Sequence, residues 1–259
     1  MTDQQCKNSI SYVEQYLSQL RDYLVDDNIN EVAINPNGSI FIEEADTVYM
    51  REIGVTLPPQ AIKRLGAQLA GETRHTLGAL NPVVSGRVMV WGNPQRVQVV
   101  VEPAIEQGVS LSIRKYLLRT SESADIDYVD GRQIMVDAVR HERHRAIADA
   151  AKAGDLKSLF RQAVDEKFNV LISGGTSSGK TTVARALLAM ANPAERIITI
   201  EDAQELHPPH KNQVGLIADR KGESARSPSN FWRAVCECVP TGSFSVKSAA
   251  LRLMTFLRR

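Results

Sequence analysis

The chain has 259 residues, of which 43% are hydrophobic and 24% are charged, a composition that excludes disordered and fibrous classes. Its 31 Lys and Arg residues against 30 Asp and Glu residues leave a formal net charge of +1, so bulk charge does not support direct nucleic-acid binding. No apolar run reaches the roughly 20 residues that cross a bilayer, and the N-terminal segment lacks the apolar core of a signal peptide. These features predict a cytoplasmic protein without a transmembrane segment.

The first 118 residues predict an α/β domain with a mainly antiparallel sheet. Apolar residues at spacings of three and four indicate a helix over residues 10–24. Pro58-Pro59 opens a second helix that ends near Gly71. Alternating apolar residues predict strands at 31–35, 39–43, 86–91, 96–101 and 109–114. Short turns rich in Pro, Asn and Gly join neighbouring strands, which is typical of hairpins.

Residues 119–150 differ in character from the rest of the chain. Their first half is polar and poor in large apolar residues, and their second half is strongly charged with a helical pattern, which together predict a linker or hinge. A second domain is expected over residues 151–239. It begins with a helix from Leu156, followed by a short strand at 169–173, a loop, a second helix and a strand at 196–200.

A glycine-rich loop lies between the strand at 169–173 and the helix that follows it. Its residues match the motif G-x-x-x-x-G-K-[ST] in the strand, loop and helix context that the motif requires; they are Gly174, Gly175, Thr176, Ser177, Ser178, Gly179, Lys180, Thr181 and Thr182. Glycines let the backbone turn its N–H groups toward phosphate oxygens at the positive end of the helix. The Lys180 ammonium can reach the β- and γ-phosphates, and the Thr181 hydroxyl can ligate Mg²⁺.

Two carboxylates, Glu201 and Glu205, follow the strand at 196–200. Ligands of α/β sheets bind beyond the carboxyl ends of the strands, so these side chains can orient a metal ion or an attacking water. The alternative is that both are ordinary acidic residues at the start of a following helix. The spacing alone leaves both interpretations open.

Three segments together carry a family resemblance. NVLISGGTSSGKTTVARALLA, ERIITIEDAQEL and HPPHKNQVGL resemble the nucleotide-binding domain of the traffic ATPases of type IV secretion and conjugation systems, within the type II/IV secretion ATPase superfamily. The resemblance extends upstream through AGDLKSLFRQAV and VSLSIRK, and it covers roughly residues 20–239. It implies an N-terminal α/β domain followed by a RecA-like domain with a phosphate-binding loop.

The resemblance also implies an assembly and a set of site residues. The family forms a hexameric ring, peripheral at the inner membrane and in contact with inner-membrane secretion components, in which the two domains close over ATP and Mg²⁺. Glu201 and Glu205 match its acidic box, with Glu201 as a metal residue. Arg114, and with less support Arg96, match its N-terminal-domain cations for the phosphates. The alternative for both arginines is an ordinary position on the surface of alternating strands.

The match ends at Pro240. The family's next elements are a strand with the acidic Walker B motif and later a histidine box, whereas residues 241–259 contain neither. If the reading frame is moved back by one nucleotide and third codon bases are chosen freely, residues 241–256 can encode DRIILGEIRGAEAYDF, which contains that motif. We therefore expect residues 240–259 to be an out-of-frame tail on an incomplete RecA-like domain. We also expect an unpaired strand, a helix over residues 249–257 and weak or absent ATP turnover.

The sequence therefore predicts a subunit of an oligomeric Mg²⁺-dependent ATPase that energises type IV secretion, conjugative transfer or pilus assembly. One alternative is another secretion or pilus ATPase of the superfamily, although the four-cysteine zinc module of some type II members is absent, since the chain has only three cysteines. The other alternative is a truncated, non-catalytic interaction protein that joins rings of an intact relative.

Overall fold

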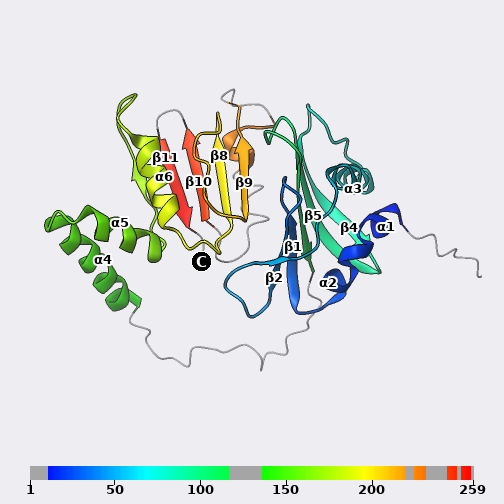
Figure 1. Ribbon diagram of the computed structural model, residues 1–259, viewed down its shortest axis with the longest axis horizontal. Helices are drawn as coiled ribbons and strands as arrows, with labels where there is room; N and C mark the ends of the chain where they lie inside the picture. The colour runs from blue at the N-terminus through cyan, green and yellow to red at the C-terminus, as the bar shows by residue number, and fades with distance from the viewer. Residues whose placement is uncertain (1–10, 117–135, 220–224, 232–243, 250–251, 258–259) are drawn as a thin grey trace, which may run out of the picture.

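The computed structural model describes residues 11–116, 136–219, 225–231, 244–249 and 252–257, and it contains two sheets with their helices (Figure 1). The first sheet and its helices comprise α1 (Tyr12–Tyr16), η1 (Ser18–Leu20), α2 (Arg21–Val25), β1 (Ile29–Ile34), β2 (Ile40–Glu44), β3 (Arg51–Ile53), α3 (Pro59–Glu72), β4 (Val83–Val90), β5 (Asn93–Val101) and β6 (Val109–Lys115). The second comprises α4 (Val136–Lys152), α5 (Leu156–Asp165), β7 (Leu171–Ile172), α6 (Lys180–Met190), β8 (Ile197–Glu201), β9 (Gln213–Ile217), β10 (Phe244–Ala249) and β11 (Arg252–Leu257).

The first sheet has the order β3-β2-β1-β6-β5-β4, and every neighbouring pair is antiparallel. This confirms the predicted antiparallel α/β unit. Helices α1 and α3 cover one face, where buried Leu17 and Leu65 belong to the same core cluster as Val99 and Leu111 of the sheet. The alternation of apolar and polar residues thus places one side of each strand in this core.

The helix predicted over residues 10–24 is wrong as a single element. The chain instead forms α1, the 3₁₀ turn η1 and α2 in succession. The 3₁₀ turn brings residues three apart onto one line, and Leu17 and Leu20 are both fully buried, as is Leu24 in α2. The apolar stripe is therefore buried as predicted, although the residues that carry it lie in three successive elements and not in one helix.

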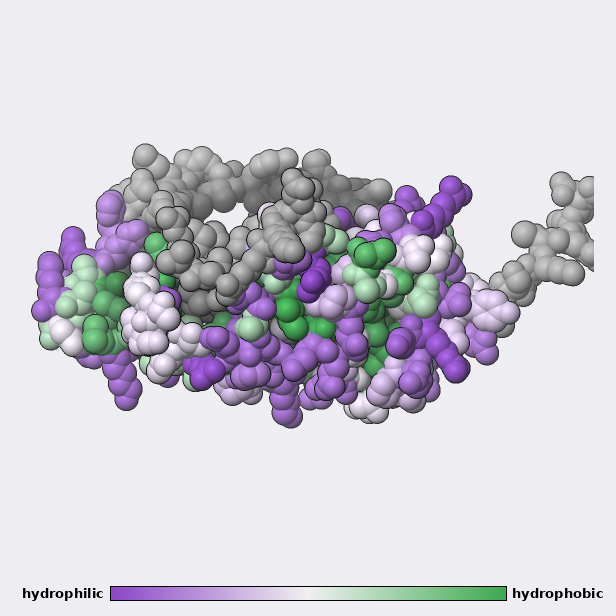
Figure 2. Space-filling model, turned by 90° about the horizontal axis from the view of Figure 1, so that it is seen from above, coloured by the Kyte–Doolittle hydropathy of each residue, from purple (hydrophilic) through white to green (hydrophobic). Residues whose placement is uncertain are grey.

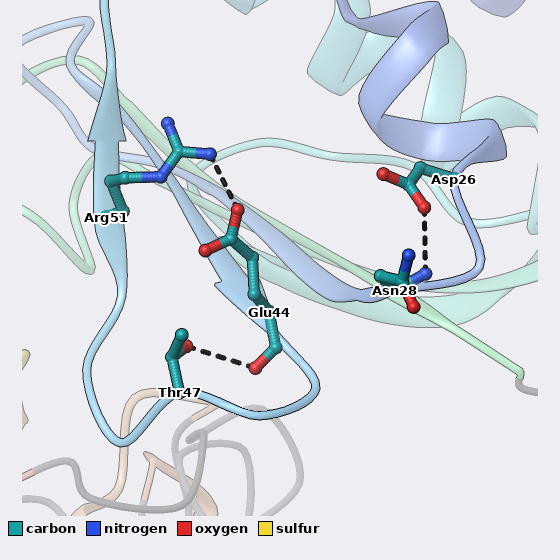
Figure 3. Close-up of polar contacts among 5 residues, drawn as sticks. All are labelled: Asp26, Asn28, Glu44, Thr47 and Arg51. Carbon is teal, nitrogen blue, oxygen red and sulfur yellow. Dashed lines mark hydrogen bonds and ion pairs between the residues drawn. The ribbon is translucent and has the colours of Figure 1, made fainter.

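The connection from β2 to β3 is held by polar contacts that Figure 3 shows. Arg51 forms an ion pair with Glu44 at 2.6 Å, and the Thr47 hydroxyl donates to the Glu44 carbonyl at 3.1 Å. Before β1, the Asp26 carboxylate accepts from the backbone N–H of Asn28 at 2.9 Å. Strand β3 has three residues, too few to produce an alternating pattern, and was not predicted.

The second sheet has the order β7-β11-β10-β8-β9. Strands β9 and β10 both run parallel to β8, and β11 is antiparallel to both β10 and β7. Strands β7 and β8 therefore point the same way, and the loop after β7 and the carboxylates after β8 lie at the same edge of the sheet. Helix α6 packs on this sheet, since buried Ala184 and Leu188 form a cluster with Ile197.

The tail does not form the predicted helix. Residues 244–257 contain the strands β10 and β11, which pair with each other as a hairpin. The hairpin occupies two positions between β8 and β7, so neither strand is left without a neighbour on that side. The expected unpaired strand is therefore also wrong, because free N–H and C=O groups on both strands accept the hairpin's backbone.

The two sheets pack against each other through the face of the first sheet that α1 and α3 leave open. Val100 and Ile105 of the first unit form one buried cluster with Ile198, Val214 and Phe231 of the second. In Figure 1, β9 lies beside the first sheet. Buried polar side chains, among them Gln98, Ser110 and Arg196, line the same contact.

The outer surface seen in Figure 2 is mainly hydrophilic, with hydrophobic residues in small separate patches. Exposed large hydrophobic residues are spread over both units, as Leu80 near β4 and Leu156 in α5 illustrate. No helix within the described residues has the length and apolar character that a membrane span requires. The apolar surface is therefore consistent with ordinary scatter on a globular protein.

Candidate functional site

The glycine-rich loop joins β7 to α6 in the conformation that its glycines allow. Gly179 has φ of +87° and immediately precedes Lys180, the first residue of α6. A Cβ on Gly174 would lie 2.5 Å from Ser178 Oγ, so a larger residue there would collide with the loop. Residues 173–178 are exposed. The loop thus forms an open turn at the positive end of α6, where backbone N–H groups can bind an anion.

Two side chains at the start of α6 lie over this turn. Lys180 Nζ donates to the carbonyl oxygen of Gly175 at 2.5 Å, so the ammonium lies across the loop. Thr181 Oγ1 donates to Glu205 Oε2 at 3.1 Å. The structure therefore brings one of the two predicted carboxylates to the predicted Mg²⁺-ligating hydroxyl, and that carboxylate is Glu205.

Glu201 has a different environment from Glu205. Its side chain is buried, with 2% exposed, and its Oε2 accepts from the backbone N–H groups of Glu205 at 2.9 Å and Leu206 at 3.1 Å. Its Oε1 has no hydrogen-bond partner in the described part of the chain. Residues 202–212 are irregular, so the alternative in which these carboxylates begin a helix is wrong.

Arg185 is a site residue that the sequence patterns did not indicate. Its guanidinium donates to the carbonyl oxygen of Glu205 through Nε at 2.8 Å and also through a terminal nitrogen. Arg185 lies four residues after Thr181, on the same side of α6. That spacing could have indicated that Arg185 lies near Thr181. The neighbouring residues do not indicate that its partner is a backbone carbonyl 20 residues away.

Arg114 and Arg96 are cross-strand neighbours on β6 and β5, and Arg114 also lies opposite Glu31 of β1. Glu31 is fully buried and accepts a hydrogen bond from the Ser112 hydroxyl at 2.7 Å. Burial raises the pKa of Glu31 to about 7, while that hydrogen bond and the positive charges of Arg196 and Arg114 act in the opposite direction.

The position of Arg196 shows where this cluster lies. Arg196 directly precedes β8, at the amino end of the parallel strands, whereas the phosphate-binding loop follows the carboxyl end of β7. Arg114 is therefore near the edge of the second sheet that is opposite to the loop. Within one chain, the structure does not bring Arg114 or Arg96 to Lys180 and Thr181.

Few side chains near the loop could bind a metal ion. Within the ranges that the structure describes, no group of three or more His, Cys, Asp or Glu side chains could hold a metal ion by itself. Thr181 and Glu205 supply a hydroxyl and a carboxylate, which are the hard oxygen donors that Mg²⁺ prefers. A site of this kind takes its other ligands from phosphate oxygens and water.

Comparison with known proteins agrees with the geometry. Residues 127–234 match the family model described as "Type II/IV secretion system protein". The chain is 29% identical over 234 residues to the type IV secretion system protein VirB11 of Bartonella quintana, covering 85% of this chain and 64% of the relative. It is 32% identical over 222 residues to protein VirB11 of Agrobacterium fabrum, covering 80% of this chain and 60% of the relative.

A solved structure supports the same assignment. The crystal structure of the VirB11 ATPase from the Brucella suis type IV secretion system, in complex with sulphate, superposes with a TM-score of 0.70 at 26% identity, over 88% of this chain and 68% of that one. This chain spans less than two thirds of the length of the VirB11 relatives named above. Residues 127–234 therefore match the type II/IV secretion system family, and the chain as a whole is similar in sequence and fold to the VirB11 proteins of type IV secretion.

Proposed function

We propose that this chain carries the nucleotide-binding site of a motor subunit that, in its native reading frame, binds and hydrolyses ATP with Mg²⁺ and energises type IV secretion or conjugative transfer. With residues 241–259 as they stand, we expect ATP binding with weak or absent turnover. The observation that carries the proposal is the loop between β7 and α6, with Lys180 lying across it and Thr181 hydrogen-bonded to Glu205. An open anion-binding turn, a cation and a pair of hard oxygen donors at one helix start are the parts that phosphoryl transfer from ATP needs.

Each part has a proposed role. The backbone of residues 174–182 holds the phosphates, and the Lys180 ammonium exchanges its carbonyl partner on Gly175 for phosphate oxygens. The Thr181 hydroxyl would hold Mg²⁺ with the Glu205 carboxylate beside it, and the ion would neutralise negative charge on the phosphate oxygens. Arg185 keeps the segment that carries Glu205 attached to α6. The chain's own residues thus bind and orient the triphosphate at one edge of the second sheet.

Arg114 belongs to this proposal through assembly. Within one chain it lies opposite Glu31 of β1, a carboxylate that also feels the charge of Arg196 just before β8, and not at the loop. A contact between Arg114 and the γ-phosphate therefore requires another copy of the chain or a different placement of the first domain. We propose a homo-oligomeric ring, at the inner membrane with other secretion components, in which this contact is made; Arg96, its neighbour on β5, is the second candidate.

The domain boundaries and the tail are also proposals. We propose domains at 1–118 and 151–239, a hinge at 119–150, and a shifted reading frame after Pro240. Strand β10 supports the last point, because it lies parallel to β8 with Lys247 opposite Ile200. The shifted frame places the Walker B glutamate at that same position, at the sheet edge that carries the loop. The nucleotide sequence of the gene tests this directly, and a frame lacking that motif would refute it.

The experiment that tests the function is nucleotide binding followed by turnover. A fluorescent ATP analogue should bind the full chain in Mg²⁺, and Lys180→Ala should abolish binding and turnover. Lys152→Ala is the matched control, because its side chain is 80% exposed on α4 and should behave as the parent. If the parent chain binds no nucleotide but still joins rings of an intact relative, the non-catalytic alternative holds.

A further inference from the structure

The two carboxylates after β8 have opposite environments, although the sequence presents them as a pair. Glu201 is 2% exposed and directed to backbone N–H groups, whereas Glu205 is exposed and its carboxylate meets the Thr181 hydroxyl. Only one of them is therefore placed to act on a metal ion beside the loop. The resemblance had assigned the metal role to Glu201.

We propose that Glu205 is the carboxylate that supports Mg²⁺ at the phosphate-binding loop, and that Glu201 is a positioning residue that acts through the backbone of Glu205. The proposal rests on the nucleotide-binding function argued above. The residues concerned are linked by hydrogen bonds from β8 to α6.

The linkage has three steps. Glu201 Oε2 accepts from the N–H groups of Glu205 and Leu206, which fixes the direction of the chain where it leaves β8. Buried Leu206 packs in the cluster that contains Ala184 and Leu188 of α6. On the other side, Arg185 binds the Glu205 carbonyl. The backbone of Glu205 is thus held by its N–H, by its carbonyl and by its neighbour.

The side chain of Glu205 is then the only part of that residue free to respond to a ligand. Its carboxylate accepts from Thr181, the residue whose hydroxyl the loop motif assigns to Mg²⁺. Outer partners of metal ligands orient them, and their loss costs about 10–100-fold in metal affinity. Glu205 is such an outer partner of Thr181. Glu201 in turn orients Glu205, but only through hydrogen bonds to the backbone.

The proposal separates two substitutions that look equivalent in the sequence. Glu205→Gln removes the charge next to Thr181 and should raise the Mg²⁺ concentration needed for tight nucleotide binding by about tenfold or more. Glu201→Gln keeps a carbonyl oxygen that can accept from the same two N–H groups, so the Mg²⁺ requirement should change little. In EDTA, the affinity of both variants for the nucleotide should equal that of the parent.

Removing the acceptor altogether tests the positioning role. Glu201→Ala should raise the Mg²⁺ requirement, and the double variant with Glu205→Gln should be no worse than Glu205→Gln alone, because both act through one side chain. Hydrogen exchange provides a second measurement that needs no nucleotide. The Glu205 and Leu206 amides should lose protection in Glu201→Ala and keep it in Glu205→Gln.

The experiment is a titration of a fluorescent ATP analogue against Mg²⁺ on the full chain, with Asp149→Asn on α4 as the carboxylate control, since its side chain is 63% exposed. If Glu201→Gln raises the Mg²⁺ requirement and Glu205→Gln does not, the assignment is reversed and the proposal fails. If Glu201→Ala does not fold, the comparison of the two Gln variants still decides. A parent chain that binds no nucleotide would overturn the proposed function, and this inference with it.

Discussion

Asn35 Nδ2 donates to Asn212 Oδ1 at 3.1 Å, although 177 residues separate the two in the chain. Arg196 donates to the side-chain oxygens of both, at 3.0 Å for Asn35. All three residues are buried, with 5% or less exposed. The three side chains therefore form one hydrogen-bonded network between the two sheets. Asn35 lies at the end of β1, Arg196 just before β8 and Asn212 just before β9.

This network should stabilise the packing of the two sheets. Asn212→Ala removes the oxygen that accepts from both partners, and leaving buried donors unpaired costs about 1–3 kcal/mol. We expect a lower free energy of unfolding by urea, with nucleotide binding at the loop unchanged when measured under folding conditions. Asn81→Ala is the control, because Asn81 is only half-buried and its side-chain amide donates to the nearby carbonyl of Thr76, outside this network. Equal stabilities of the two variants would contradict the role assigned to the network.

Glu31 should make stability fall as the pH rises. Its pKa is about 7 in the folded chain against 4.5 as the ordinary value, so the folded state binds more protons than the unfolded state. Its stabilising contribution is complete below pH 4.5 and is lost as the pH rises through 7, by up to roughly 3 kcal/mol. Desolvation is the main cause, opposed by Ser112 and by the charges of Arg196 and Arg114, and reinforced by Glu43.

Glu31→Gln should remove this pH dependence while keeping an acceptor for Ser112. Urea unfolding at pH 5 and pH 8 measures the effect: the variant should gain stability relative to the parent at pH 8 and little at pH 5. Glu106→Gln provides the control at an exposed carboxylate. A parent chain that becomes more stable over this range, while Glu31→Gln does not, would show that the sign is wrong.

The sequence predicted best what local chemistry determines. The loop at 174–182 is recognisable because the glycines and Lys180 act on a turn formed by neighbouring residues. Strand β9 was missed because Gly215 interrupts its pattern; the Gln204 side chain packs closely there, since a Cβ on Gly215 would lie 2.6 Å from its amide nitrogen. The different environments of Glu201 and Glu205, like the pairing of Asn35 with Asn212, depend on tertiary packing and leave no local pattern.

The conformation of the loop predicts that two glycines are needed for different reasons. Gly179→Ala places a side chain at φ of +87°, which costs about 1–2 kcal/mol locally, and Gly174→Ala forces a collision with Ser178. Both variants should bind nucleotide more weakly while thermal unfolding changes little, because the loop is exposed. Gly71→Ala is the control, since nothing lies within 4 Å of its Cβ position. Parent-like nucleotide affinity in Gly174→Ala would argue that the loop relaxes.

The contact between the sheets should depend strongly on Phe231. Its side chain is 1% exposed and packs with Val100 of β5 and Leu216 of β9. Phe231→Ala should destabilise the chain by about 3–5 kcal/mol through lost burial and the cavity left behind, whereas Leu156→Ala should not, because Leu156 is 61% exposed. Chemical unfolding of the two variants measures the difference, and similar losses in both would mean that this interface contributes little.

Arg114 lies at the edge of the second sheet opposite to Lys180, and this separation makes assembly testable. Lys180→Ala has an intact Arg114 and a defective loop, while Arg114→Ala has an intact loop and lacks the arginine. Both variants are made in the gene with its reading frame restored after Pro240. If Arg114 of one copy serves the loop of another, a mixture of the two inactive variants should regain part of the ATP turnover of the parent ring. If Arg114 acts only within its own chain, every subunit carries one defect and mixing restores nothing. Arg87→Ala is the control for Arg114→Ala. The Arg87 guanidinium lies 5.7 Å from the ring centroid of Tyr116, away from the loop, so this variant should be active without mixing.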